Sequence, residues 1–320
     1  MQLTLRTAPA LSRPLDVVAD GRLTLAAEGP DGHAFVSGAS GVATVGGASW
    51  VISDSSPQPA RFGDWNAPGV VQSGLPERAR RYDLETITTL TRDARGGALL
   101  LSLGSGSKGD RTVGFAQNVD ATGAATSAPL RVDVAPLFKH LAKEVDGQLN
   151  IEGAAVRDAL GGAELLLFNR GQSSDHASRV FVLDAAAVSD AIRSGTAVTS
   201  AVLRSSHAID LGRLDNGARL AFSDAHALAD GRIVFSASSE TSAGGGDGAI
   251  TGSAIGILDR DLRVTVLHPL AGPPRKVEGI TMARDLDPSA PADRVIMITD
   301  PDDNTVAGER LHVDLGTALS

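Results

Sequence analysis

The sequence predicts an all-β fold built from one unit that is used several times, and three observations support this prediction. Apolar runs of about four to six residues, rich in Val, Ile and Leu and bounded by Gly, Asp, Asn or Ser, recur along the chain, as is typical of short buried strands. The runs come in sets of similar order that repeat roughly every 45 to 70 residues. Turn sequences such as RDARGG and RDALGG join the first two runs of a set, which indicates antiparallel neighbours.

Five sets follow this plan, and each opens on an acidic or small polar residue. The openings, in chain order, are SGVATV from Ser40, DLETITTL from Asp83, NIEGAAV from Asn150, SDAHAL from Ser223 and KVEGITM from Lys276. The second runs are SWVISD, ALLLSLGSG, ELLLFNRG, RIVFSASSE and RVIMITD. Third runs follow in the four later sets, for example RVFVLD at 179–184, whereas the set that opens at Ser40 is the weakest copy.

A fourth apolar stretch after the third run predicts an outer strand. It reads PLRVDV from Pro129, TSAVLRSS from Thr199 and RVTVLHPL from Arg263. Four strands per unit are typical of the blade of a β-propeller, so we predict one propeller domain over residues 1–320. Five openings favour five blades, and residues 1–36 leave room for a sixth as the alternative. A β-sandwich is the competing architecture.

The ends of the chain and two interruptions complete the predicted fold. The last set stops at Leu319 without a fourth strand, so we predict that the N-terminal segment LTLRTAP supplies it and closes the ring. Two segments interrupt the strand pattern, at 134–145 and 184–195. The first has Leu137 and Leu141 four residues apart, and the second begins at Asp184 and ends at Gly195, which predicts two short helices between blades.

Composition excludes several classes of function. The formal charge is −9 without a basic stripe, which argues against nucleic acid as a partner. No apolar run approaches the roughly 18 residues of a membrane span, and no signal-peptide core stands at the N-terminus, so we expect a cytoplasmic protein, or a periplasmic or secreted one if a leader has been removed. The absence of cysteine excludes disulfides, thiolate catalysis and zinc–thiolate sites.

Acidic residues recur at the strand openings. The repeat alignment places Glu85, Glu152, Asp224 and Glu278 at one position, with Ser40 in the remaining set. If the first strands line the axis, these carboxylates converge there, and an all-oxygen site suits a divalent cation, with calcium favoured over magnesium. Asn150 would add a neutral oxygen ligand. The alternative is a structural latch, in which each carboxylate accepts hydrogen bonds from the neighbouring blade.

Three further residues are candidates for catalysis. Arg170 and Lys276, together with Arg80 and Arg81, would form a cationic collar that orients an anionic substrate group. The alternative is that they are ion pairs that relieve repulsion between the carboxylates. His226 stands two residues after Asp224, on the same strand face, and is a candidate general base or a hydrogen-bonded packing residue.

Several stretches of the sequence resemble a known group of proteins. LLSLGSGS, LNIEGAAV with LLLFNRGQSS, FSDAHALADGRIVFSASSE, and RKVEGIT followed by ITDPDD resemble uncharacterised bacterial propeller proteins distantly akin to the esterase-like phytase group, over residues 40–315. A looser similarity is to gluconolactonase and regucalcin propellers, whose divalent ion is held by an axial Glu, Asn and Asp set. The resemblance implies a propeller with an axial acidic site and carries no substrate.

We therefore predict a metal-dependent hydrolase of a small ester, lactone or phosphoester. In this hypothesis the four acids and Asn150 hold a divalent cation, Arg170 and Lys276 orient an anionic small molecule, and His226 acts as the base. The competing hypothesis is a non-catalytic propeller that binds a ligand or a protein partner and in which the acids are structural.

Overall fold

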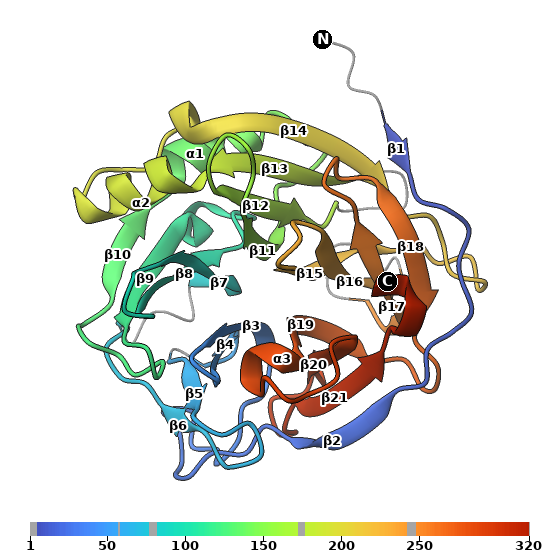
Figure 1. Cartoon of the computed structure of the whole chain (residues 1–320), viewed down its shortest axis with the longest axis horizontal. Coiled ribbons are helices and arrows are strands. Elements are labelled where there is room, and N and C mark those ends of the chain that lie inside the picture. Colours follow the sequence, from blue (N-terminus) through green and yellow to red (C-terminus); the bar gives the residue numbers. More distant parts are fainter. Residues whose placement is uncertain (1–4, 57, 77–81, 172–176, 242–247, 320) are drawn as a thin grey trace.

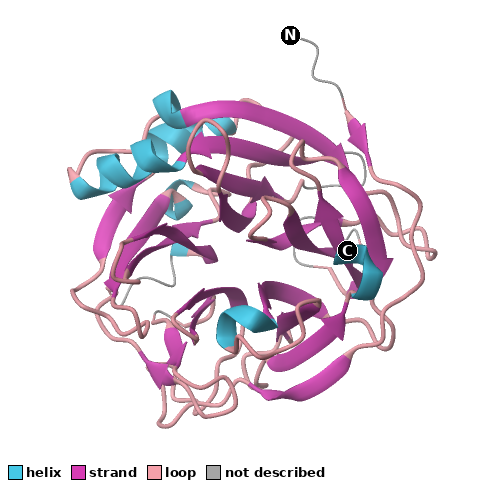
Figure 2. Cartoon of the chain, in the orientation of Figure 1, coloured by secondary structure: helices cyan, strands magenta, loops and turns pink. Residues whose placement is uncertain are grey.

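The computed structural model describes residues 5–56, 58–76, 82–171, 177–241 and 248–319 and has five sheets arranged as blades around a central axis (Figures 1 and 2). The predicted all-β propeller with five blades is thereby confirmed. In each blade the first strand of the repeat is innermost, and the following strands lie progressively outward in antiparallel order. Within the described residues, no helix has the length and apolar character needed to cross a membrane.

Most strands of the five blades agree with the predicted runs, but the third and fourth strands of blade 1 and the fourth strand of blade 5 were not predicted. Blade 1 holds β3 (Ala39–Val45), β4 (Ala48–Ser53), β5 (Ala60–Phe62) and β6 (Val70–Val71). Blade 2 holds β7 (Leu84–Arg92), β8 (Ala98–Gly104), β9 (Val113–Val119) and β10 (Leu130–Asp133). Blade 3 holds β11 (Ile151–Arg157), β12 (Glu164–Asn169), β13 (Ser178–Asp184) and β14 (Leu203–Asp210). Blade 4 holds β15 (Ala221–Ala227), β16 (Ile233–Glu240), β17 (Ile250–Leu258) and β18 (Val264–Pro269). Blade 5 holds β19 (Lys276–Met282), β20 (Arg294–Asp300), β21 (Glu309–Asp314) and β2 (Val18–Arg22).

A strand from the N-terminal part of the chain closes the ring, but it is not the predicted one. The closing strand is β2, which pairs antiparallel with β21, whereas LTLRTAP contributes only β1 (Arg6–Thr7), parallel to β14 at the edge of blade 3. Between β1 and β2 the chain follows the outer edge of blade 4, where the Ser12 amide donates to the Leu267 carbonyl at 2.8 Å. We call residues 6–22 the belt, and Figure 1 shows it passing outside blades 3 and 4 before it joins blade 5.

The helices of the described residues are short, and the two predicted ones lie at the outer side of the ring (Figure 1). The two predicted segments form α1 (Ala135–Leu141) and α2 (Ala185–Arg193), and the Asp184 carboxylate caps α2 by accepting a hydrogen bond from the Ala187 amide at 3.0 Å. A four-residue helix, α3 (Ala283–Leu286), follows β19 and was not predicted. The 3₁₀ turns with described bounds are η2 (Gly109–Arg111), η3 (Ser200–Val202) and η4 (Gly316–Leu319).

The hydrophobic core is divided among the five interfaces between neighbouring blades. Each of the five clusters of buried side chains draws its members from two adjacent blades, as Phe168 of β12 and Phe222 of β15 illustrate with rings 5.1 Å apart. Leu137 and Phe138 of α1 join the cluster between blades 2 and 3. Because every blade buries both faces, its strands are almost continuously apolar, and this is why the runs stand out in the sequence.

Each innermost strand has a β-bulge near its start. In every one the register skips a single residue, and the skipped residues are Ser40, Glu85, Glu152, Ser223 and Glu278. A bulge leaves the extra residue unpaired and turns its side chain in a new direction. The bulge corrects the repeat alignment in blade 4, where the equivalent of the glutamates is Ser223 and not Asp224.

Candidate axial metal site

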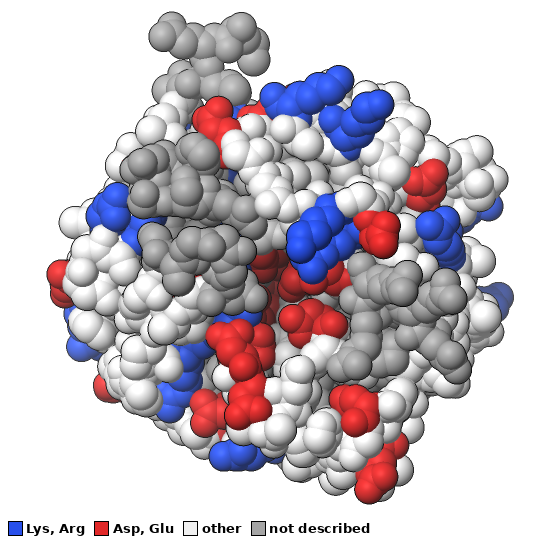
Figure 3. All heavy atoms as spheres, turned by 180° about the vertical axis from the view of Figure 1, so that it is seen from behind, with Lys and Arg blue, Asp and Glu red and all other residues white. Residues whose placement is uncertain are grey.

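Three of the five bulge residues bring their carboxylates together at the axis. One ligand oxygen each from Glu85 of β7, Glu152 of β11 and Glu278 of β19 lies within 4.8 Å of the other two. Glu152 and Glu278 are 3% and 2% exposed, and Glu85 is partly exposed. Acidic side chains accordingly gather around the central hollow of the face seen in Figure 3. We call these three residues the axial triad.

Glycine follows two of the three bulge glutamates because there is no room for a side chain directly after the bulge. A Cβ atom at Gly153 would lie 2.9 Å from the Asp224 Cα of the next inner strand, and one at Gly279 would lie 2.6 Å from Ile298 Cγ1. At Gly153 glycine therefore permits β11 and β15 to approach each other closely, whereas at Gly279 it makes room for a side chain of β20 in the same blade. The Glu-Gly pairs in NIEGAAV and KVEGITM thus reflect backbone packing as well as the position of the acids.

Arg170 and Asn150 surround the carboxylate of Glu152. The Arg170 guanidinium lies 3.5 Å from Glu152 Oε1 and also forms an ion pair with Glu240 at the end of β16. The Asn150 side-chain amide donates to Glu152 Oε1, and the Asn150 backbone amide donates to Asn169 Oδ1 at 2.7 Å. The predicted Asn150 is therefore beside the triad, where it holds Glu152 in place through its nitrogen.

Lys276 has the corresponding position beside Glu278. Its ammonium group lies 3.9 Å from Glu278 Oε1 and donates hydrogen bonds to Asp300 at 3.0 Å and Asp302 at 2.9 Å. At 3.9 Å the contact with Glu278 is an ion pair and not a hydrogen bond. Among the described residues, Glu278 Oε1 has no hydrogen-bond partner although it is fully buried. A buried carboxylate oxygen without a partner is costly, so this atom is available to a ligand.

Burial dominates the electrostatics of the triad. It raises the pKa of Glu85 well above the usual range, and the neighbouring carboxylates of Glu152 and Asp83 add to the effect. Burial likewise raises the pKa of Glu152, against the opposing pull of Arg170 and Lys276. The pKa of Glu278 rises to about 8 because burial outweighs the attraction of Lys276. The triad is thus a group of acids that are reluctant to ionise without a cation between them.

The environment of the site favours the charged forms of its two cations, Arg170 and Lys276. Burial disfavours the charged forms of Arg170 and Lys276, but the surrounding carboxylates outweigh burial. Glu152, Glu278 and Glu240 raise the pKa of Arg170 above its usual range. Glu278, Asp300 and Asp302 do the same for the pKa of Lys276. Both side chains therefore remain positively charged inside the site.

Asp224 and His226 are not part of this cluster. Asp224 Oδ2 accepts a hydrogen bond from the Ile280 amide of the neighbouring blade at 2.8 Å, which is the geometry of the alternative latch. His226 stands three residues beyond Ser223, about 10 Å along the strand. Its Nε2 lies 2.9 Å from the Asp285 carboxylate of α3. The structure thus brings together Glu85, Glu152, Glu278, Asn150, Arg170 and Lys276, and separates Asp224 and His226 from them.

Two participants were not predicted, Glu240 and Asp302. Glu240 ends the second strand of its blade, as Asn169 and Asp300 end theirs, and these ends meet the starts of the innermost strands at one mouth. The shared position at the end of the second run was the available signal for Glu240. Asp302 lies in the following loop and gave no such signal. Arg80 and Arg81, the other members of the predicted collar, lie outside the described residues.

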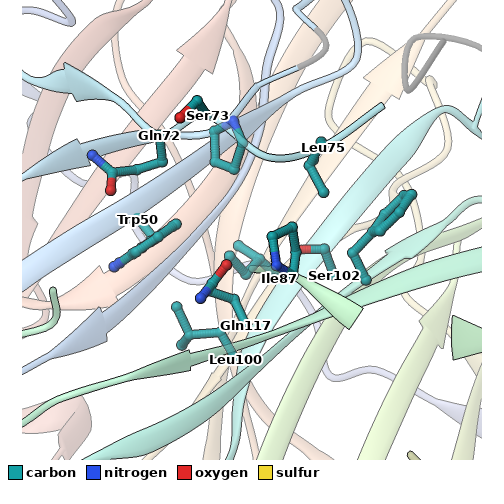
Figure 4. A pocket seen from close by; sticks show the side chains of 11 residues that line it. Trp50, Gln72, Ser73, Leu75, Ile87, Leu100, Ser102 and Gln117 are labelled. Atoms are coloured by element: carbon teal, nitrogen blue, oxygen red, sulfur yellow. The ribbon is translucent and has the colours of Figure 1, made fainter. Parts of the chain in front are cut away.

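A second concave feature lies between blades 1 and 2. Figure 4 shows this crevice, which Trp50, Leu75 and Phe115 line together with the amides of Gln72 and Gln117. None of the residues that line it is titratable. It therefore lacks groups for acid–base chemistry or metal binding.

Comparisons with known proteins identify the fold and a family. A model of a protein family of unknown function matches residues 35–315. No curated protein matches the sequence. Among solved structures, an exo-β-1,3-galactanase from Phanerochaete chrysosporium is 10% identical with a TM-score of 0.53, and the match covers 95% of this chain and 65% of that one.

Two further solved structures have lower TM-scores. An α-L-arabinanase from Cellvibrio cellulosa is 13% identical (87% and 91% covered, TM-score 0.49), and a gluconolactonase from Xanthomonas campestris is 11% identical (96% and 99% covered, TM-score 0.39). At these identities the likeness concerns the fold alone. Gluconolactonases are thus among the structural neighbours, as the looser resemblance implied, whereas the resemblance to the esterase-like phytase group stays a prediction.

Proposed function

The chain belongs to DUF6929, a family of unknown function, so the geometry of its axial site has to supply the evidence for what it does. From that geometry we propose that the protein is a divalent-metal-dependent hydrolase of a small ester, lactone or phosphoester. The observation that carries the proposal is the axial triad, in which three carboxylates from three blades converge and one buried oxygen of Glu278 has no hydrogen-bond partner among the described residues. Glu85, Glu152 and Glu278 would hold the ion.

The donor set supports calcium over magnesium. All three ligands are carboxylate oxygens, which hard divalent cations prefer. Calcium binds oxygens at about 2.3–2.6 Å, so two of its ligands can stand up to roughly 5 Å apart, whereas magnesium at about 2.0–2.1 Å limits that separation to roughly 4.2 Å. The triad oxygens lie within 4.8 Å of one another, and calcium, with its longer bonds and more variable coordination, tolerates the wider part of that range better than magnesium.

Such an ion would polarise a substrate oxygen and lower the pKa of a water molecule. The protein would contribute fixed ligand positions on rigid inner strands, with Asn150 and Arg170 orienting Glu152 and with Lys276 beside Glu278. His226 pairs with Asp285, away from the triad. Its role as a base stays a prediction, and it would require the substrate to reach the part of the axis where His226 lies.

The test is ion binding by the purified protein, measured by metal analysis and calorimetry with calcium, magnesium, manganese and zinc. We expect one ion per chain, a higher melting temperature with the ion, and loss of both in the Glu152→Gln/Glu278→Gln double variant. A control with the same change of charge, Glu28→Gln/Glu144→Gln, should bind normally because both residues lie outside the triad. Undiminished binding by the triad variant would refute the proposal.

A binding propeller without catalysis is the second candidate. The hydrogen bond that Asp224 accepts from the neighbouring blade and the ion pairs of Arg170 and Lys276 favour it, since all of these are structural contacts. Under this alternative the triad would bind no ion, and substitution of Glu152 and Glu278 would alter stability alone. Recovery of a stoichiometric partner together with absence of ion binding would support it.

A further inference from the structure

We propose that the substrate of the axial site is uncharged near the bond that is cleaved, so that it is a neutral ester or lactone and not a phosphoester or another anion. This inference rests on the proposed hydrolase function and narrows its substrate class. It follows from how the two cations of the site are used. In the sequence these residues suggested a collar for an anion, but in the structure their charges are already compensated.

Lys276 has little capacity left for an anion. An ammonium group has three N–H donors, and two of them are engaged by Asp300 at 3.0 Å and Asp302 at 2.9 Å. The Lys276 side chain is only 10% exposed, and Glu278 Oε1 lies 3.9 Å from its ammonium nitrogen. An anionic substrate could reach only the third N–H donor, which lies beside the Glu278 carboxylate, and that carboxylate would repel it.

Arg170 is engaged in the same way. Its two terminal nitrogens face two different carboxylates, those of Glu152 and Glu240, and its side chain is 13% exposed. A guanidinium that orients an anionic substrate normally offers a free pair of parallel N–H groups. In this site each terminal nitrogen faces a different protein carboxylate, so the two nitrogens cannot bind one anion together without losing an ion pair.

The charge balance of the mouth is negative even with an ion bound. The acids of the triad and the partners of the two cations are Glu85, Glu152, Glu240, Glu278, Asp300 and Asp302. In this set six carboxylates face two cations, so a bound divalent ion still leaves the set with a formal surplus of two negative charges. A field of that sign repels anions from the mouth and selects against them.

The test compares esters that differ only in charge. We would measure kcat/KM of the ion-loaded full chain for two 4-nitrophenyl esters of adipic acid, one with the distal carboxyl group as its methyl ester and one with that carboxylate free, each divided by its rate in buffer. The acyl chain, the reacting bond and the leaving group are the same, and only the second ester carries a charge. We expect at least a tenfold preference for the neutral ester and no turnover of 4-nitrophenyl phosphate. Preference for either anion would overturn the inference.

A charge variant tests the cause of that preference. Asp302→Asn removes one carboxylate from Lys276 and leaves the triad intact, and asparagine suits the left-handed backbone of this position, whose φ is 53°. We expect the ratio of anionic to neutral turnover to rise several-fold. Asp314→Asn is the matched control, because Asp314 pairs with Arg294 at the other end of blade 5, and its ratio should not change. An equal ratio in both variants would overturn the inference.

Failure of this inference can be separated from failure of the proposed function. If the chain binds an ion and prefers the anionic ester, the hydrolase proposal stands and only the neutral substrate is wrong. If the chain binds no ion, the proposed function is wrong and the substrate inference falls with it. If an ion binds without turnover, calorimetry with δ-valerolactone and with 5-hydroxyvalerate repeats the comparison, and tighter binding of the carboxylate would overturn the inference.

Discussion

Glu278 couples proton binding to folding at the scale of a single residue. Its pKa in the folded protein is about 8, against an ordinary value of 4.5, so between these values the folded state holds a proton that the unfolded chain has released. The resulting stabilisation is fully present below pH 4.5 and is lost as the pH rises through 8. The slope is at most about 1.4 kcal/mol per pH unit for this one group.

We therefore expect the ion-free protein to become less stable as the pH rises from about 5 to 9. Urea unfolding in the presence of a chelator measures this, and Glu278→Gln should reduce the slope because it removes the titrating group. Added calcium should stabilise most at alkaline pH, where the ligands are deprotonated. Glu144→Gln, a substitution in the turn that follows α1, serves as the control. A slope that is the same in Glu278→Gln and in the control would contradict this account.

Single residues show where prediction from sequence reached its limit. Glu85, Glu152 and Glu278 could be found because they open equivalent runs. Asp224 was misplaced by one position, since a β-bulge changes which residue is unpaired without leaving a mark in the apolar pattern. The partner of His226 could not be predicted either, because Asp285 belongs to a four-residue helix that lacks a periodic signal.

Close approach of the inner strands is the property of the elements that most affects the site. Gly153→Ala would place a methyl group 2.9 Å from Asp224 Cα and 3.2 Å from the Ala225 amide nitrogen, and these are backbone atoms that cannot rotate away. We expect a loss of about 1–3 kcal/mol in the free energy of unfolding, together with weaker ion binding as β11 shifts and displaces Glu152. Denaturant titration and calorimetry measure the two effects.

Gly109→Ala provides the control for this substitution. A Cβ atom at Gly109 would meet nothing within 4 Å, and its backbone does not have a positive φ. It should leave both stability and ion affinity nearly unchanged. If Gly153→Ala behaves like Gly109→Ala, the close contact between β11 and β15 does not position the site.

At the level of elements, strands were predictable to the extent that they are buried. The inner and second strands have apolar runs because both faces of a blade are covered, and all of them were found. The closing strand β2 was missed because its sequence, VADGR, is exposed at every residue and carries no apolar pattern. Its place is decided by pairing with β21, which is a property of the tertiary structure.

The closure of the ring governs the stability of the whole molecule. Arg22 and Glu309 are directly paired partners on β2 and β21, at a spacing that a disulfide can bridge. The chain has no cysteine, so an Arg22→Cys/Glu309→Cys variant contains a single possible intramolecular bridge. Oxidation should stabilise the fold by about 2–4 kcal/mol, because the bridge encloses nearly the entire chain and restricts the unfolded state.

The same variant with a reductant is the control for this experiment, since the loss of the Arg275–Glu309 ion pair is common to both forms. Guanidinium unfolding of the oxidised and reduced forms gives the difference directly. Equal midpoints would contradict the prediction that a bridge across the closure stabilises the fold. At this scale the sequence predicted the number of blades and a closing N-terminal strand, whereas the path of the belt depended on contacts between distant residues.

During synthesis, β2 of the belt is made long before β21, the strand with which it pairs. Asp20 and His312, which are hydrogen bonded across the closure, lie 292 positions apart. At roughly 5–20 residues per second, β2 leaves the ribosome about 15 to 60 seconds before its partner strand exists. A strand left unpaired for so long is a hazard if it is apolar, because it can join the edge of another chain. The charged and glycine-containing sequence of β2 is therefore suited to waiting in a crowded cell without aggregating.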